Sequence, residues 1–124
     1  MRSYKPGAVT EVKFVGTDGI THWAGIHPTL DDALDRAERV YREEAQRDLV
    51  VTELFGGRHV ANSFHYIGRA ADLRTNTLRP EVKTAVYTAL VAALAPLKYT
   101  VVDEGDHFHI EPAAPRSDYP PTLV

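Results

Sequence analysis

Two stretches of helical periodicity constrain the fold of this 124-residue chain more than any other feature. Segments rich in β-branched residues separate them. The first helix is expected to open at Pro28, with Thr29 placed to cap it. The second is expected to open at Pro80, because proline is tolerated in a first helical turn, and to close at Pro96. In both stretches apolar residues recur at three- and four-residue steps and so share one helical face. They are Leu30, Ala33, Leu34, Ala37, Val40 and Tyr41 in the first, and Val82, Ala85, Val86, Ala89, Leu90 and Ala93 in the second.

Short alternating or β-branched segments predict the strands of a sheet that these helices would cover. The predicted strands are residues 10–15, 49–54, 69–73, 98–103 and 107–111, and residues 20–26 are either extended or irregular. The last two strands flank Glu104-Gly105, which predicts an antiparallel hairpin. The order strand, helix, strand, strand, helix, strand, strand predicts an α+β domain with two main helices on one side of a mainly antiparallel sheet.

The length fits a single domain, which we place at residues 1–112. The final 13 residues hold four of the eight prolines and cannot continue a sheet interior. We therefore expect residues 113–124 to form a proline-rich tail that runs extended along the surface.

The composition narrows the classes of function. A net charge of −3 gives no broad attraction to nucleic acid or to anionic membranes, so neither is expected as a partner. No apolar run reaches the roughly 20 residues that a membrane span needs, and no secretory signal is visible after Met1. The chain has no cysteine, so any metal must be held by nitrogen and oxygen ligands.

Three residues, His65, Asp72 and His109, are candidate metal ligands. Two imidazoles and one carboxylate suit a divalent ion of borderline softness, above all zinc. Three protein ligands leave a fourth position free for water, which is typical of a catalytic site. The candidates lie in two patches of unusual composition, Ser63–Asp72 and Asp106–Glu111.

Strand geometry applies to the second patch. Side chains two apart on a strand share a face, so His107 and His109 would point one way while Phe108 and Ile110 enter the opposite, apolar layer. This suits a histidine pair at the floor of a cleft. Two histidines on a solvent-exposed face are the alternative.

The first patch requires a bend. His65 and Asp72 are seven positions apart, and Gly68 between them allows the chain to turn so that both reach one ion. Asp72 lies between two apolar residues, and a carboxylate in that setting is costly to bury unless it is paired or bound to a cation. A surface aspartate on an edge strand is the alternative.

Together the two patches resemble a known motif. The pattern S-x-H-x-x-G-x-A-x-D, followed about 35 residues later by D-x-x-H within D-H-F-H, resembles the zinc signature of the LAS metallopeptidases. That group includes D-Ala-D-Ala carboxypeptidases and dipeptidases, phage L-alanyl-D-glutamate endopeptidases and the N-terminal domain of hedgehog proteins. The resemblance covers roughly residues 25 to 112 and implies a hedgehog- or D-Ala-D-Ala-peptidase-like fold. The residues that carry it are Ser63, His65, Gly68, Ala70, Asp72, Asp106, His107 and His109.

The resemblance implies roles for these residues. His65, Asp72 and His109 would bind Zn²⁺, and Asp106, three residues before the last ligand, would be the catalytic acid and base. His107 would lie close to the metal without binding it.

Two further residues are candidates for roles at the site. Glu104 is a rival for the base, and Asp106 must sit in the turn before the strand for its spacing to His109 to work. Arg58 could take the part of a substrate-binding arginine that larger relatives carry, and an ordinary solvated loop arginine is the alternative.

The implied function is zinc-dependent hydrolysis of a peptide bond in peptidoglycan stem peptides, as a D,D-carboxypeptidase or an L-Ala-D-Glu endopeptidase. Such an enzyme would be made in the cytoplasm and act on the bacterial cell wall as a phage lysin or virion-associated protein. The alternative is a non-catalytic zinc-binding structural or interaction module on the same scaffold, such as a virion component. A non-haem iron oxygenase also uses two histidines and a carboxylate, but the spacing of seven and the two helices argue against it.

Overall fold

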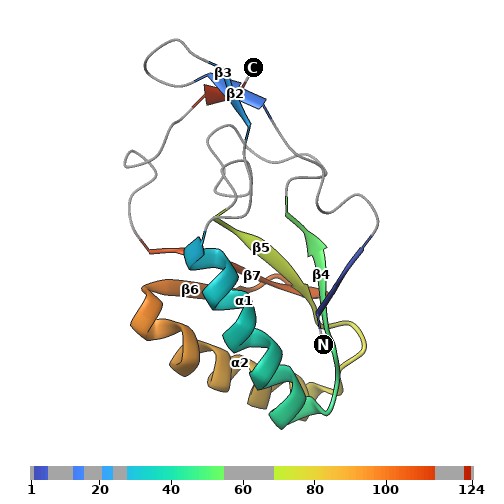
Figure 1. Ribbon diagram of the computed structural model, residues 1–124. Coiled ribbons are helices and arrows are strands. Elements are labelled where there is room, and N and C mark those ends of the chain that lie inside the picture. The colour runs from blue at the N-terminus through green and yellow to red at the C-terminus, as the bar shows by residue number, and fades with distance from the viewer. Residues whose placement is uncertain are drawn as a thin grey trace.

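The computed structural model describes residues 2–5, 13–15, 21–23, 28–54, 69–113 and 122–123 (Figure 1). Its main sheet has five strands in the order β1-β4-β5-β7-β6. The pairing of β1 with β4 is parallel and the other three pairings are antiparallel, which confirms the α+β class and the mainly antiparallel sheet. The strands are β1 (Arg2–Tyr4), β4 (Leu49–Glu53), β5 (Ala71–Arg74), β6 (Tyr99–Asp103) and β7 (His107–Pro112).

A second, three-stranded sheet has the order β3-β2-β8. It is built from β2 (Lys13–Val15), β3 (Thr21–Trp23) and β8 (Thr122–Leu123), and it lies at the end of the molecule away from helix α2 (Figure 1). The prolines predict only an extended tail here, and the strand β8 within that tail was not predicted. Thr122 and Leu123 follow Pro120-Pro121 and have backbone N–H groups, so they can pair with β2 at a sheet edge.

Two helices cover one face of the five-stranded sheet (Figure 1). Helix α1 (Pro28–Val40) runs into a π-helical turn, η1 (Tyr41–Ala45), and α2 (Pro80–Leu94) is followed by a 3₁₀ turn, η2 (Ala95–Leu97). Pro80 takes the first helical position, as predicted. The first helix begins at Pro28, as predicted, and Thr29 therefore lies inside its first turn and does not precede it as a cap.

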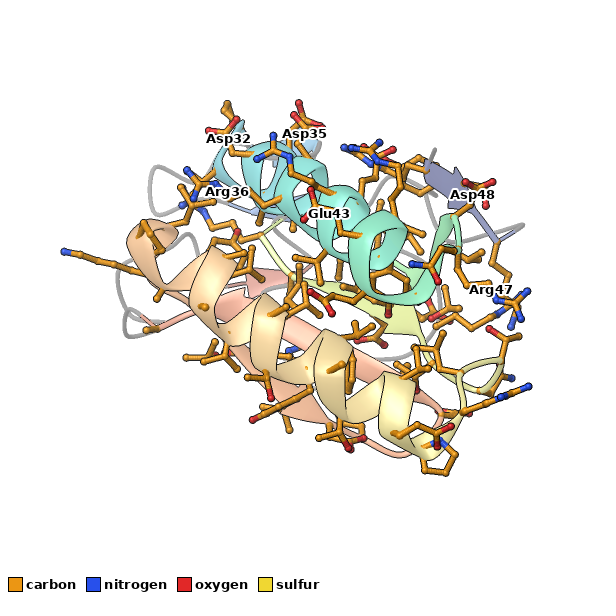
Figure 2. All side chains as sticks on the ribbon, turned by 90° about the horizontal axis from the view of Figure 1, so that it is seen from below. Asp32, Asp35, Arg36, Glu43, Arg47 and Asp48 are labelled. Atoms are coloured by element: carbon orange, nitrogen blue, oxygen red, sulfur yellow. The ribbon has the colours of Figure 1, made fainter. Side chains whose placement is uncertain are left out.

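The core lies between the helices and the sheet. Its largest fully buried side chains are Tyr41, Phe108, Leu30, Leu34, Leu49, Leu54, Leu73, Leu90, Leu94, Ile110, Val51 and Val86. Burial of each such side chain stabilises the fold by roughly 1.5–3 kcal/mol. On the outer side of α1, Asp32 is exposed, Asp35 pairs with Arg2 of β1, and Arg36 donates to the carbonyl of Ala93 on α2 (Figure 2). Neither helix in the described ranges has the length and hydrophobicity that a membrane span requires.

The strand β7 divides its residues between the two faces of the sheet. Phe108 and Ile110 are fully buried against the helices, whereas His107 and His109 are partly exposed on the other face. The alternation predicted from the sequence is therefore confirmed. The face of the sheet opposite α1 and α2 carries the polar residues that form the site described next.

Candidate metal centre

Sheet register brings the two patches together. The strand β5 is the central strand of five, and Asp72 on it is the direct partner of His109 on β7. The alternative of a surface aspartate on an edge strand is wrong, because Asp72 is only 8% exposed. Glu104 lies in the turn between β6 and β7, at the end of the strand on which both histidines stand.

Five donor atoms from four residues converge on this part of the sheet. His109 Nδ1 lies 2.9 Å from Asp72 Oδ1 and 3.8 Å from Glu104 Oε1. His107 Nε2 lies 3.6 Å from Asp72 Oδ2 and 3.6 Å from the same Glu104 Oε1. Asp72, Glu104 and His107 each offer a ligand atom within 4.8 Å of the other two.

The 3.6 Å separations of His107 Nε2 from Asp72 Oδ2 and Glu104 Oε1 suit a metal ion, whereas the 2.9 Å between His109 Nδ1 and Asp72 Oδ1 is a hydrogen-bond distance. Bonds of about 2.0–2.2 Å in a tetrahedral site place ligand atoms roughly 3.3–3.6 Å apart. The donor set is mixed imidazole and carboxylate, as a chain without cysteine requires. Asp72, Glu104 and His107 could therefore hold a metal ion, and His109 Nδ1 reaches the same space.

Each histidine is oriented by a carboxylate on its other ring nitrogen. His109 Nε2 is 2.8 Å from Glu111 Oε1, and His107 Nδ1 is hydrogen-bonded to Asp106 Oδ1. Such outer carboxylates fix the ring orientation and tautomer of a ligating histidine. Each ring thus turns one nitrogen toward the shared donor space and keeps the other on a carboxylate.

The same contacts shift the pKa values of two groups. Burial lowers the pKa of His109, but hydrogen bonds to Asp72 and Glu111 outweigh it and raise the pKa above its usual value. Metal binding at Nδ1 requires loss of the proton there, whereas the bond from Nε2 to Glu111 can remain. The hydrogen bond from His107 and its positive charge lower the pKa of the Asp106 carboxyl, which keeps that group ionised at neutral pH.

The turn that carries Glu104 and Asp106 is held from two sides. Lys83 on α2 donates to the carbonyl of Gly105 at 2.6 Å and lies 3.0 Å from Asp103. Thr75, just after β5, donates its hydroxyl to the same carbonyl at 3.2 Å and its N–H to the carbonyl of Asp106 at 3.0 Å. Gly105 has a φ of +97°, which L-residues rarely adopt, so glycine is required at the apex.

A cleft of about 260 Å³ opens beside the centre. Asp72, Asp106 and His107 line it together with residues of β4, the residue that follows β1, and residues at and after the end of β5. The centre therefore borders a space in which a small ligand can lie against its donor groups.

Four of the predicted site residues lie among the residues that the structure describes. Asp72, His107 and His109 lie together, and Asp106 sits in the turn, where its spacing to His109 requires it, with its side chain 75% exposed. The candidates His65, Arg58 and Ser63 and the bend at Gly68 lie outside the described residues.

Glu104 and Glu111 take positions that sequence reasoning did not assign to them. The sequence offers Glu104 as a rival base, and the structure places its carboxylate among the donor atoms. Glu111 stands two residues from His109 on the same strand face, and that spacing was a usable signal for a carboxylate that orients the ring.

Comparison of the chain with protein-family models, with curated proteins and with solved structures finds no match. The resemblance to the LAS metallopeptidases thus depends on the motif residues. Two of these residues, Asp72 and His109, are paired by the register of β5 and β7.

Proposed function

We propose that this protein is a zinc-dependent peptidase that hydrolyses a peptide bond in peptidoglycan stem peptides, on a scaffold of the LAS type. One observation carries the proposal. The motif assigns Asp72 and His109 as ligands of the same ion, although they are 37 residues apart in the sequence. In the structure they are cross-strand partners, and His109 Nδ1 lies 2.9 Å from Asp72 Oδ1. The proposed ligands are His65, Asp72 and His109, and Glu104 and His107 add donor atoms in the same space.

The chemistry of the bound ion defines what the protein residues must do. When bound, zinc supplies a Lewis acid and a water whose pKa is about 7. The chain must then accept a proton from the attacking water, deliver one to the departing amine, and hold the substrate carbonyl in place.

Asp106 is the proposed acid and base. Its carboxylate lines the cleft together with Asp72 and His107, and it is ionised at neutral pH, as a group that accepts a proton must be. Glu104 does not line this cleft but lies within 3.6 Å of His107 Nε2, which favours a role on the ion. His107, with Arg58 as a further candidate, would stabilise the negative charge that develops on the carbonyl oxygen.

The test is digestion of purified sacculi followed by mass spectrometry of the released muropeptides. The zinc-loaded protein should release fragments of defined stem-peptide length, a chelator should abolish the release, and added zinc should restore it. Activity that survives complete removal of metal would refute the mechanism. Loss of a terminal D-alanine would identify a D,D-carboxypeptidase, and cleavage between L-Ala and D-Glu would identify an endopeptidase.

A non-catalytic zinc module on the same scaffold gives a different outcome in this experiment. It would bind zinc tightly and leave the sacculi intact. The position of Asp106 favours the enzyme, because a purely structural ion needs no carboxylate facing a cleft.

A further inference from the structure

Helix α2 is apolar on its exposed side as well as on its buried side. Its only charged residues, Glu81 and Lys83, lie in the first turn, and no charged residue follows before Lys98. Helix α1, of similar length, carries six charged residues. A helix that is apolar all round is typical of one that is buried on every side. Val91 of α2 is nevertheless 43% exposed, which makes its outer side a candidate interaction surface.

The exposed residues of this side form a stripe that borders β6. Tyr87 shows where the stripe lies, because its ring packs against Phe108 of β7 with the ring centroids 5.6 Å apart. Its hydroxyl also donates to the carbonyl of Val101 on β6 at 3.4 Å. The residues of the stripe recur at three- and four-residue steps, as residues on one helical face do. They are Thr84, Tyr87, Thr88, Val91 and Ala95.

The strand β6 is the last strand of the five-stranded sheet in the described part of the chain. The carbonyl of Lys98 accepts a hydrogen bond from the N–H of Ala113 at 2.8 Å, and the N–H of Glu104 donates to the carbonyl of His107 at 2.9 Å. Backbone groups of an antiparallel strand alternate between its two sides, so the even-numbered residues face β7 and the odd-numbered residues face outward. The outward set is Tyr99, Val101 and Asp103.

This edge carries little that would repel a second strand. Exposed edges are commonly protected by charged side chains, proline or bulges. The sequence of β6 holds no proline and one charged residue, Asp103, which is paired with Lys83 of the same chain at 3.0 Å. Val102 is 48% exposed, and Thr100 beside it is exposed and uncharged. The edge can therefore accept another strand.

The outward groups match those of a second copy of the same strand. If two β6 strands run antiparallel about a two-fold axis at Val101, Val101 faces itself and Tyr99 faces Asp103 of the second copy. Every outward residue of the strand then has a partner. Lys98 opposes Glu104 of the second copy, so opposite charges meet on both sides of the axis. The carbonyl of Val101 can take the new bond besides the one from Tyr87, because a carbonyl has two lone pairs.

The same axis brings the two α2 helices into contact. Paired strands are about 4.7–4.9 Å apart, so the axis would lie about 2.4 Å outside β6. The contacts of Tyr87 place α2 over both β6 and β7. The centre of the helix is then about 5 Å from the two-fold axis, and the two helices are about 10 Å apart. Packed helices have interaxial distances of about 8–10 Å, so the two stripes would pack directly on each other.

We propose that the protein forms a two-fold symmetric dimer, in which the β6 strands of two copies join their sheets and the two α2 stripes pack together. Both copies use the same surface, so the contact closes after two copies and does not propagate into a fibre. This inference goes beyond the proposed function and does not depend on it.

Analytical ultracentrifugation of the full chain over a range of concentrations tests the dimer. The mass should rise from 13.8 kDa to twice that value, with a Kd below roughly 100 μM. Val91→Lys places like charges on the two facing stripes and should raise this Kd at least about tenfold. Asp32→Asn is the matched control, because it changes the net charge equally on the outer side of α1 and should keep the parent Kd (Figure 2). Both positions are exposed, and urea unfolding checks that each variant folds.

Spin labelling tests the strand and its register. The chain has no cysteine, so Thr100→Cys introduces a single attachment site. In the proposed register Thr100 faces Val102 of the second copy, which places the two labelled Cα atoms about 8 Å apart. The spectrum should show spin–spin broadening that dilution with unlabelled protein removes. A label at Asp32→Cys, on the outer side of α1, should show none (Figure 2).

Three results would overturn the proposal. The first is a protein that stays at 13.8 kDa up to about 1 mM. The second is a dimer whose Kd is unchanged in Val91→Lys, and the third is a dimer without broadening at position 100. The last two would assign the dimer to another surface. Hydrolysis of sacculi is measured independently, so failure of the dimer leaves the proposed function standing, and failure of hydrolysis leaves the dimer standing.

Discussion

Asp72 and His109 are cross-strand partners at the centre of the sheet, with the Nδ1 of the imidazole 2.9 Å from Oδ1 of the carboxylate. Their shared neighbour Glu104 is 3.8 Å from the same ring nitrogen. Directly opposed residues on paired strands have Cβ atoms about 4.5–5.5 Å apart, so the two side chains start from neighbouring positions that only a change in register would separate. The sheet therefore holds the backbones of this pair at a fixed spacing in any metal site on this face.

Loss of the Asp72 carboxylate should remove the metal. Asp72→Asn keeps the shape of the side chain and removes its charge, so we expect zinc content after dialysis to fall from near stoichiometric to near zero. Glu111→Gln should weaken zinc binding by only about 10–100-fold, because that carboxylate orients His109. Elemental analysis and a competition titration measure both effects. Asp32→Asn, on the outer side of α1, is the control (Figure 2).

The two candidate third ligands can be separated by the same measurement. If the motif describes the site, His65→Ala abolishes zinc binding, while His107→Ala retains the metal and lowers turnover. We expect this result because the motif assigns His65 to the ion. Loss of zinc from His107→Ala with full binding in His65→Ala would assign the site to Asp72, Glu104 and His107 instead.

The assignment of the base depends on which carboxylate faces the cleft. Asp106→Asn should keep zinc and lower kcat by about 10²–10⁴-fold, the usual contribution of a general acid or base. Glu104→Gln should weaken zinc binding, because its Oε1 lies among the donor atoms. The assignment is wrong if Asp106→Asn loses the metal while Glu104→Gln keeps it and loses turnover.

The hairpin turn requires a glycine at its apex. Gly105 has a φ of +97°, and a Cβ built on it meets no atom within 4 Å, so the cost of a side chain is backbone strain alone. We expect Gly105→Ala to lower the free energy of unfolding by about 1–3 kcal/mol and to weaken zinc binding through displacement of Glu104. Gly105→Asn should cost less, because asparagine tolerates positive φ. Urea unfolding compares the two, and equal stability of Ala and Gly at this position would contradict the strain argument.

Tyr41 should make the fold sensitive to alkaline pH. Burial raises the pKa of its phenol, whose hydroxyl donates to the carbonyl of Arg74 at 2.9 Å. The folded state thus holds this proton more tightly than the unfolded chain, where the pKa is about 10. The resulting stability is present below about pH 10 and is lost as the pH rises further, by up to about 1.4 kcal/mol per pH unit.

Tyr41→Phe tests this linkage. The variant should lose about 1 kcal/mol at neutral pH through the missing hydrogen bond, and its stability above pH 10 should fall less steeply than that of the parent protein. Urea unfolding at a series of pH values measures both slopes. Parallel slopes for the two proteins would show that another group controls the alkaline transition.

Much of the secondary structure is readable from the chain because its causes are local. Pro80 marks the first turn of α2, and Phe108 and Ile110 alternate with His107 and His109 because strand side chains point to opposite faces in turn. The hairpin of β6 and β7 also follows from neighbouring residues, since Glu104-Gly105 separates two strand segments. By contrast, the strand 69–73 was predicted two residues early, and β1 was not predicted at all, since residues 2–4 carry no periodic signal.

The sequence by itself determined which residues are able to bind a metal and that both histidines of β7 share one face. Tertiary structure alone decided that Asp72 stands opposite His109, that Glu104 enters the donor space, and that Asp106 faces a cleft with Arg74. The physical reason is that strand register depends on hydrogen bonds between segments distant along the chain. A slip of one residue would turn Asp72 into the core and separate it from His109.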